Sequence, residues 1–132
     1  MSEAADRWMA FASEDLQMAE LALPGKIYNQ VCFHSQQCVE KVLKALLSKL
    51  GRTVPRTHSI TDLLENLPPG WFADLHDDLT LLDDFYIPAR YPDAIPGSLP
   101  EGLPGKADAE QNIALARIVT EKAWRLIQSD SQ

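Results

Sequence analysis

Apolar residues recur at helical spacing through most of the chain. Near the start they are three or four residues apart, which predicts an amphipathic helix over residues 3–22 that Pro24 and Gly25 end. The residues on this first apolar face are Trp8, Ala12, Leu16, Ala19 and Leu23.

Asp15 interrupts this apolar face. At about 100° per residue its side chain falls between Trp8 and Ala12, in the middle of the apolar stripe. An unpaired carboxylate is costly there, because burial removes its water. We therefore predict a cationic or hydrogen-bonding partner for Asp15, with Lys41 and Arg90 as the first candidates.

A second and longer helix is predicted over residues 27–50, a segment without Gly or Pro, and Gly51 is its expected stop. It would be about 36 Å long. Cys32 and Cys38 both fall on it, about 9 Å apart along the axis and too far for a disulfide, so we interpret them as reduced core residues. Its wide apolar face comprises Val31, Ser35, Cys38, Val39, Val42, Leu43, Leu46, Leu47 and Leu50.

Three further segments complete the pattern. Ser59 with Asp62 fits the capping start of a short helix that ends before Pro68. Near-heptad apolar spacing predicts a fourth helix over residues 71–87, and residues 107–128 predict a last one. The fourth is marked by Phe72, Leu75, Leu79, Leu82 and Tyr86, and the last by Ile113, Leu115, Ala116, Val119, Thr120, Ala123, Trp124, Leu126 and Ile127.

Between these last two helices, prolines and glycines exclude regular helix over residues 88–105. A loop of this length is usually functional or disordered. The sequence therefore predicts one all-α domain over residues 1–132. We expect an antiparallel up-and-down bundle of four long helices and one short one, with the long Pro/Gly-rich loop before the last helix.

Composition narrows the function classes. The net charge of −7 argues against a generic binder of polyanions. No apolar run reaches the roughly 18 residues that span a bilayer, and the first residues lack the pattern of a secretory signal. We expect a cytoplasmic protein with no membrane partner. No residue spacing indicates a metal site or a cofactor.

A polar stripe runs beside the apolar face of the central helix. His34, Gln37, Lys41 and Lys44 fall within about 80° of one another, so their donors could hold a phosphate or a base. The alternative is a stripe that is solvated or tied to its own neighbours.

Arg90 forms the second candidate site, between Pro88 and Pro92. A guanidinium on so restricted a backbone suits bidentate recognition of phosphate or carboxylate. Tyr91 and Asp93 follow directly. The alternative is an internal salt bridge from Arg90. Its candidate acceptors are Asp15, Asp83, Asp84 and Asp93.

Four groups of residues, in order from about residue 8 to residue 125, resemble the HEPN family of nucleotide-binding domains. The groups are Trp8, Ala12, Asp15, Leu16 and Ala19; Phe33 to Gln37 with Glu40, Lys41, Leu43 and Lys44; Thr57 to Ile60 with Leu63 and Leu64; and Tyr86 to Asp93.

The resemblance implies a helical bundle that dimerises and is often encoded beside a minimal nucleotidyltransferase in a toxin–antitoxin or similar pair. Many members are metal-independent ribonucleases in which an Arg holds the scissile phosphate and a His a few residues later transfers protons. Here Arg90 fills the Arg position and Asp93 lies inside the motif, but Ile95 stands where close relatives can have His. Arg52 and His58 have a similar spacing outside the motif, so we interpret His58 as a capping or packing residue.

The leading hypothesis is a HEPN-type nucleotide- or RNA-binding homodimer that partners a nucleotidyltransferase. Its expected site consists of Arg90, Lys41, Gln37, His34, Lys44, Tyr91 and Asp93. One alternative is a metal-independent endoribonuclease toxin, in which His34 or Tyr91 replaces the missing His. Another is a purely structural partner that binds and regulates a nucleotidyltransferase.

Overall fold

The computed structural model describes residues 3–85 and 104–129, and the regular structure within these ranges is entirely helical. The all-α prediction is confirmed. The three long helices begin and end within one residue of their predicted bounds. The elements are α1 (Glu3–Ala22), α2 (Tyr28–Lys49), α3 (Ile60–Glu65), the 3₁₀ turn η1 (Ala73–Leu75), α4 (His76–Leu81), the 3₁₀ turn η2 (Leu82–Phe85) and α6 (Lys106–Ser129).

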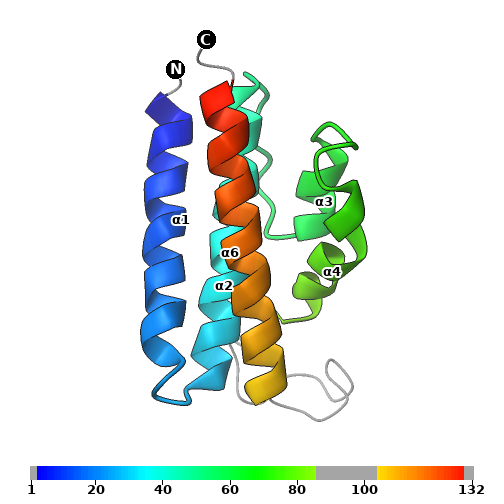
Figure 1. The fold of residues 1–132 in the computed structure, drawn as a ribbon. Helices are drawn as coiled ribbons and strands as arrows, with labels where there is room; N and C mark the ends of the chain where they lie inside the picture. The colour runs from blue at the N-terminus through cyan, green and yellow to red at the C-terminus, as the bar shows by residue number, and fades with distance from the viewer. Residues whose placement is uncertain (1–2, 86–103, 130–132) are drawn as a thin grey trace.

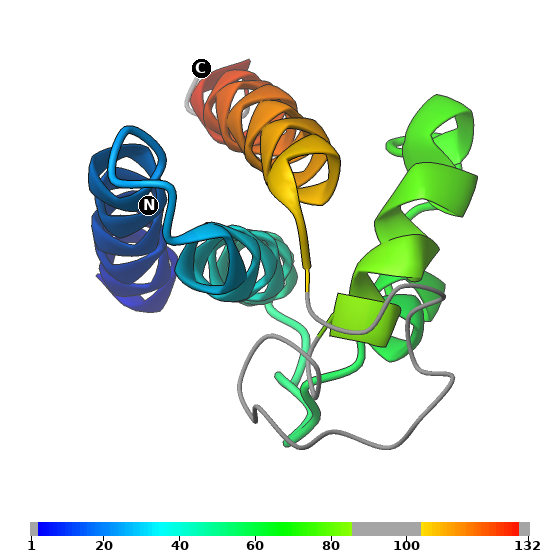
Figure 2. The same ribbon diagram turned by 90° about the horizontal axis from the view of Figure 1, so that it is seen from below.

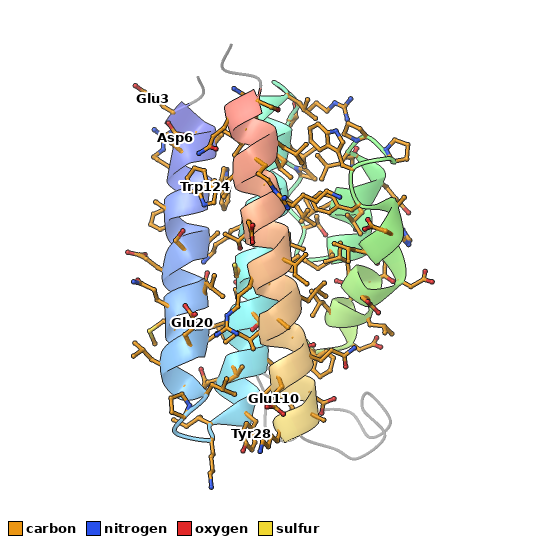
Figure 3. The ribbon with its side chains drawn as sticks, in the orientation of Figure 1. Glu3, Asp6, Glu20, Tyr28, Glu110 and Trp124 are labelled. Carbon is orange, nitrogen blue, oxygen red and sulfur yellow. The ribbon has the colours of Figure 1, made fainter. Side chains whose placement is uncertain are left out.

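The long helices pack side by side, with α1 running opposite to α2 and α6 (Figure 1). Seen along the bundle, α1 lies at one edge and the α3–α4 segment at the other, with α2 and α6 between them (Figure 2). An exposed ion pair joins Glu20 of α1, which is labelled in Figure 3, to Arg117 of α6 at 3.2 Å. None of the described helices combines the length and the apolar character needed to cross a membrane.

Helix α2 is the centre of the core. All residues of its predicted apolar face are buried except Leu50, which is half-buried. Gly51, with a φ of 73°, takes the left-handed conformation that ends the helix, as predicted. Burying each large apolar side chain contributes about 1.5–3 kcal/mol, so the buried face of this helix contributes strongly to the stability of the bundle.

The fourth long helix was a wrong prediction. In its place the chain forms η1, α4 and η2, and the backbone at Leu75 (φ −112°, ψ 1°) departs from the α-helical region. The segment contains five aspartates, which have low helix propensity, and neither η1 nor α4 has a capping side chain. Three-residue spacing still buries Leu79, Leu82 and Phe85, because residues i and i+3 share a face in a 3₁₀ turn.

The structure also places Trp124 and the two cysteines. Trp124, one of the residues that mark the predicted last helix, is exposed near the end of the bundle where α1 begins (Figure 3). Cys32 and Cys38 are buried and free, as predicted.

Candidate functional site

Asp15 of α1 faces α2 and contacts two of the predicted site residues. Lys41 Nζ lies 2.5 Å from Asp15 Oδ2, and His34 Nδ1 lies 2.9 Å from Asp15 Oδ1. Because an ionised carboxylate only accepts hydrogen bonds, this contact assigns a proton to Nδ1 of His34. The carboxylate at the otherwise apolar face of α1 thus has both a cation and an imidazole donor.

Glu40 of α2 forms a second cluster of the same kind. Lys44 Nζ donates to Glu40 Oε2 at 3.0 Å, and His58 Nδ1 lies 3.1 Å from Glu40 Oε1. The Glu40 side chain is only 4% exposed. The Lys44 ammonium also lies 5.4 Å from the centroid of a Trp8 ring, a cation–π distance.

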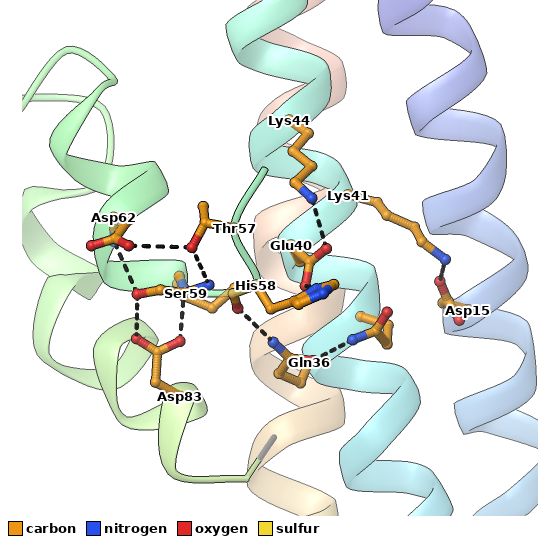
Figure 4. A network of polar contacts seen from close by, with 12 residues as sticks. Asp15, Gln36, Glu40, Lys41, Lys44, Thr57, His58, Ser59, Asp62 and Asp83 are labelled. Atoms are coloured by element: carbon orange, nitrogen blue, oxygen red, sulfur yellow. Dashed lines mark hydrogen bonds and ion pairs between the residues drawn. The ribbon is translucent and has the colours of Figure 1, made fainter. Parts of the chain in front are cut away.

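The two clusters lie on different sides of α2 (Figure 4). The cluster of Asp15 joins α2 to α1, whereas that of Glu40 joins α2 to the chain that leads into α3. In each cluster, a carboxylate neutralises a lysine that the sequence predicts to bind phosphate. Lys41 and Lys44 therefore present little uncompensated positive charge to a ligand.

The remaining member of the stripe, Gln37, is also tied to a neighbour. Its Nε2 donates to Gln36 Oε1 at 2.7 Å, and Gln36 Nε2 donates to the carbonyl oxygen of His58 at 3.3 Å. Gln36 is fully buried and was not singled out from the sequence. All four stripe residues thus have a partner within the protein, which is the alternative that the sequence left open.

Asp83 anchors the other end of this network (Figure 4). Its carboxylate accepts hydrogen bonds from the backbone N–H groups of Ile60 (2.6 Å) and Thr61 (3.1 Å), and from the hydroxyls of Ser59 and Thr61. Ser59 itself caps α3 by accepting from the N–H of Asp62, as the sequence predicted. These bonds fix the turn that carries His58. Sequence reasoning had named Asp83 only as a possible partner of Arg90.

Arg90, Tyr91, Asp93 and Ile95 lie outside the described residues. The chain approaches that segment from Phe85, which belongs to an apolar cluster with Val31 and Cys32 of α2. Phe85 therefore lies close to the turn of α2 that precedes His34. Arg52 and His58 have separate partners, since Arg52 donates to the carbonyl oxygen of Asn66 and His58 contacts Glu40.

The two thiols are unsuited to nucleophilic chemistry. Burial raises the pKa of Cys32 from 9.0 to about 12 and the pKa of Cys38 to about 11. Cys38 Sγ lies 3.3 Å from the hydroxyl oxygen of Thr120. A thiol is a weak nucleophile until it ionises, so both cysteines act as core residues. Within residues 3–85 and 104–129, no three His, Cys, Asp or Glu side chains are placed to hold a metal ion.

Comparison with known proteins identifies the family to which this chain is similar. The family model described as the HEPN domain matches residues 5–126. A protein of Methanocaldococcus jannaschii named "Putative toxin MJ1304" is 31% identical over 121 residues, which cover 83% of this chain and 79% of that protein. The crystal structure of TT1696 from Thermus thermophilus is 33% identical with a TM-score of 0.80, and that of ST0689, described as an archaeal HEPN homologue, is 36% identical with a TM-score of 0.75. Each alignment covers 95% of this chain and 98% of the other.

Proposed function

The chain belongs to the HEPN domain family, and from this premise we propose that it is the HEPN member of a toxin–antitoxin-like pair. It acts as a homodimer, binds a nucleotide or RNA, and pairs with a minimal nucleotidyltransferase. The relative named as a toxin supports the toxin–antitoxin context.

The observation that carries the binding proposal is the packing of Phe85 beside the turn of α2 that precedes His34. Arg90 follows Phe85 by five residues in the sequence, and it is the cation that binds phosphate in the family motif. Asp15 and Glu40 neutralise Lys41 and Lys44. We therefore expect Arg90 to be the residue that pairs with the negative charge of the ligand. The two lysines then act mainly by holding the carboxylates.

Calorimetric titration with mononucleotides and short single-stranded RNA at low salt tests this function. The wild-type protein should bind, with affinity that falls as salt rises, since phosphate contacts release counterions. Arg90→Ala should lose roughly tenfold or more in affinity, as expected for a charge-assisted contact. Arg125→Ala, which removes the same charge from the exposed side of α6, is the matched control and should bind normally.

If no nucleotide or RNA binds to the wild-type protein at low salt, the binding proposal is wrong and a pure protein-interaction role replaces it. Co-expression with the product of the adjacent gene tests the pairing separately. A nucleotidyltransferase that co-purifies would support the pair whichever way the titration comes out.

A further inference from the structure

A small apolar hollow lies at the end of α3. Its volume is about 240 Å³, below the roughly 300–1,000 Å³ of pockets that take drug-sized ligands, so it suits one or two side chains. Glu65 and His76, both exposed, add polar groups to its lining. We call it the α3 hollow, and its apolar lining residues are Leu64, Leu67, Pro68, Pro69 and Phe72.

Bonds within the protein hold the shape of the α3 hollow. Arg52 donates to the carbonyl oxygen of Asn66, just past the end of α3. The N–H of Trp71 donates to the carbonyl oxygen of Pro68 at 3.1 Å. Two successive prolines restrict the backbone between these bonds, and the buried residues of the lining belong to the main apolar cluster of the core. A hollow formed in advance can bind a side chain without the cost of ordering its own walls.

The charge around the α3 hollow is negative. Residues 60–85 contain seven acids and no lysine or arginine, and these seven equal the net charge of −7 of the whole chain. Lys122 of α6 reaches this side of the bundle, where its Nζ lies 3.8 Å from the carboxylate of Asp74. Glu65 and Asp77 are exposed, so their charges can attract a cation from outside the chain.

We propose that the α3 hollow binds a basic peptide segment of another protein. One apolar side chain of the segment fills the hollow, and Lys or Arg side chains on either side of it lie beside Glu65 and Asp77. The sign of the surface selects this occupant. RNA, an anionic lipid surface or the same surface of a second copy would each bring negative charge against negative charge. A basic segment is stabilised both by burial of its apolar side chain and by attraction to the carboxylates.

The α3 hollow is separate from the region used by the proposed nucleotide site. Asp83 of η2 accepts from the N–H groups of Ile60 and Thr61 at the start of α3, whereas the hollow lies around the other end of that helix. Phe85, which leads toward Arg90 in the sequence, belongs to the same 3₁₀ turn as Asp83. The inference therefore goes beyond the proposed function and does not depend on it.

Nuclear magnetic resonance of the ¹⁵N-labelled full chain, titrated at low salt with synthetic peptides, tests the proposal. Each peptide carries a central anchor of Leu, Phe or Trp with two Lys or Arg residues on either side. We expect saturable shifts of the amide signals of Leu64, Glu65, Leu67 and His76. A Gly in place of the anchor should raise the dissociation constant by roughly tenfold or more, because the hollow is then left unfilled.

Two variants test the role of charge. Glu65→Gln and Asp77→Asn each remove one carboxylate charge with little change of shape. Each should raise the dissociation constant by roughly two- to fivefold, as for an exposed ion pair. Glu110→Gln is the matched control, because it removes an exposed carboxylate near the start of α6, and it should leave the constant unchanged.

The outcomes are distinct. Shifts confined to the α3 hollow that weaken without the anchor and without either carboxylate support the proposal. If no peptide shifts these signals at millimolar concentration, the proposal is wrong. Equal binding of the Gly-centred peptide overturns the role of the hollow, and unchanged binding by both carboxylate variants overturns the role of charge. A single-stranded RNA that shifts the same amides would show that the surface does not select cations, which also overturns the proposal.

Discussion

Asp15 Oδ2 and Lys41 Nζ lie 2.5 Å apart and join α1 to α2 through an ion pair at the edge of the apolar core. Asp15 also holds His34, so removing its carboxylate leaves two donors without their acceptor. The loss of partner groups, more than the loss of volume, should decide the cost, because partly buried polar groups regain little water.

Asp15→Ala should therefore lower the free energy of unfolding by about 1–3 kcal/mol, as measured by urea unfolding. Glu121→Ala removes an exposed carboxylate from α6 and serves as the control. It should change stability by less than about 0.5 kcal/mol. An equally small effect at Asp15 would mean that the charge cluster contributes nothing to stability.

Asp83→Ala should destabilise the α3 segment. The substitution leaves the N–H groups of Ile60 and Thr61 without the carboxylate that accepts from them. We expect a loss of about 1–3 kcal/mol, since these bonds are charge-assisted and partly buried. Hydrogen exchange should localise the loss, with faster exchange at residues 60 and 61 than in α2.

Asp84→Ala is the control for this experiment, because Asp84 is the exposed neighbour in the same 3₁₀ turn. Equal losses in both variants would trace the effect to the helical propensity of η2 rather than to the bonds at α3.

The three long helices could be predicted from the sequence because each buries one continuous face. In α6, five residues of the predicted face that follow one another at three- and four-residue steps are all buried: Ile113, Ala116, Thr120, Ala123 and Ile127. Such periodicity is a local signal, and packing against α2 reinforces it. The same reasoning placed Asp15 on the buried side of α1, which is why a partner for it could be expected at all.

The contacts of Asp83 and Glu40 could not be predicted in this way. Asp83 binds the N-terminus of α3, about twenty residues earlier in the chain, and nothing near it in the sequence marks that target. Its engagement there accompanies the break of the predicted fourth helix. Glu40 likewise contacts His58, from the turn that follows α2, together with Lys44. Pairings between elements depend on the fold, which periodicity alone does not supply.

The thiol of Cys32 makes the stability of the folded protein depend on pH. Its pKa is about 12 in the folded protein against 9.0 for an ordinary thiol, because burial disfavours the thiolate. Above pH 9 the unfolded chain releases this proton while the folded chain keeps it, so rising pH favours unfolding. The contribution of Cys32 is therefore fully present below pH 9 and is lost as pH rises toward 12.

Urea unfolding between about pH 8 and about pH 10.5 measures this linkage. Stability should fall by up to about 1 kcal/mol per pH unit from this group alone, and Cys32→Ala should reduce the slope. Comparison of the two slopes removes the contribution of every titratable group that the two proteins share. Identical slopes would contradict the raised pKa.

The last prediction concerns RNA cleavage. We expect little or no ribonuclease activity from the wild-type protein, because Ile95 occupies the motif position where a His would transfer the proton of the ribose 2′-hydroxyl. Ile95→His should raise the rate of cleavage of a single-stranded RNA by roughly 10²–10⁴, the usual contribution of a positioned acid or base. Gel analysis of a labelled RNA without added metal measures the change.

Arg90→Ala in the Ile95→His background is the control, since loss of the phosphate-binding cation should abolish the gained cleavage. Robust metal-independent cleavage by the wild type that disappears in Arg90→Ala would reverse the expectation. His34 would then be the next group to change, because Asp15 holds its Nδ1 at 2.9 Å in the way that a carboxylate orients a catalytic imidazole. His34→Gln keeps a polar side chain at that position but cannot transfer protons near neutral pH. Cleavage that vanishes in this variant, while circular dichroism shows intact helices, would make His34 the catalytic base; cleavage that persists would exclude it.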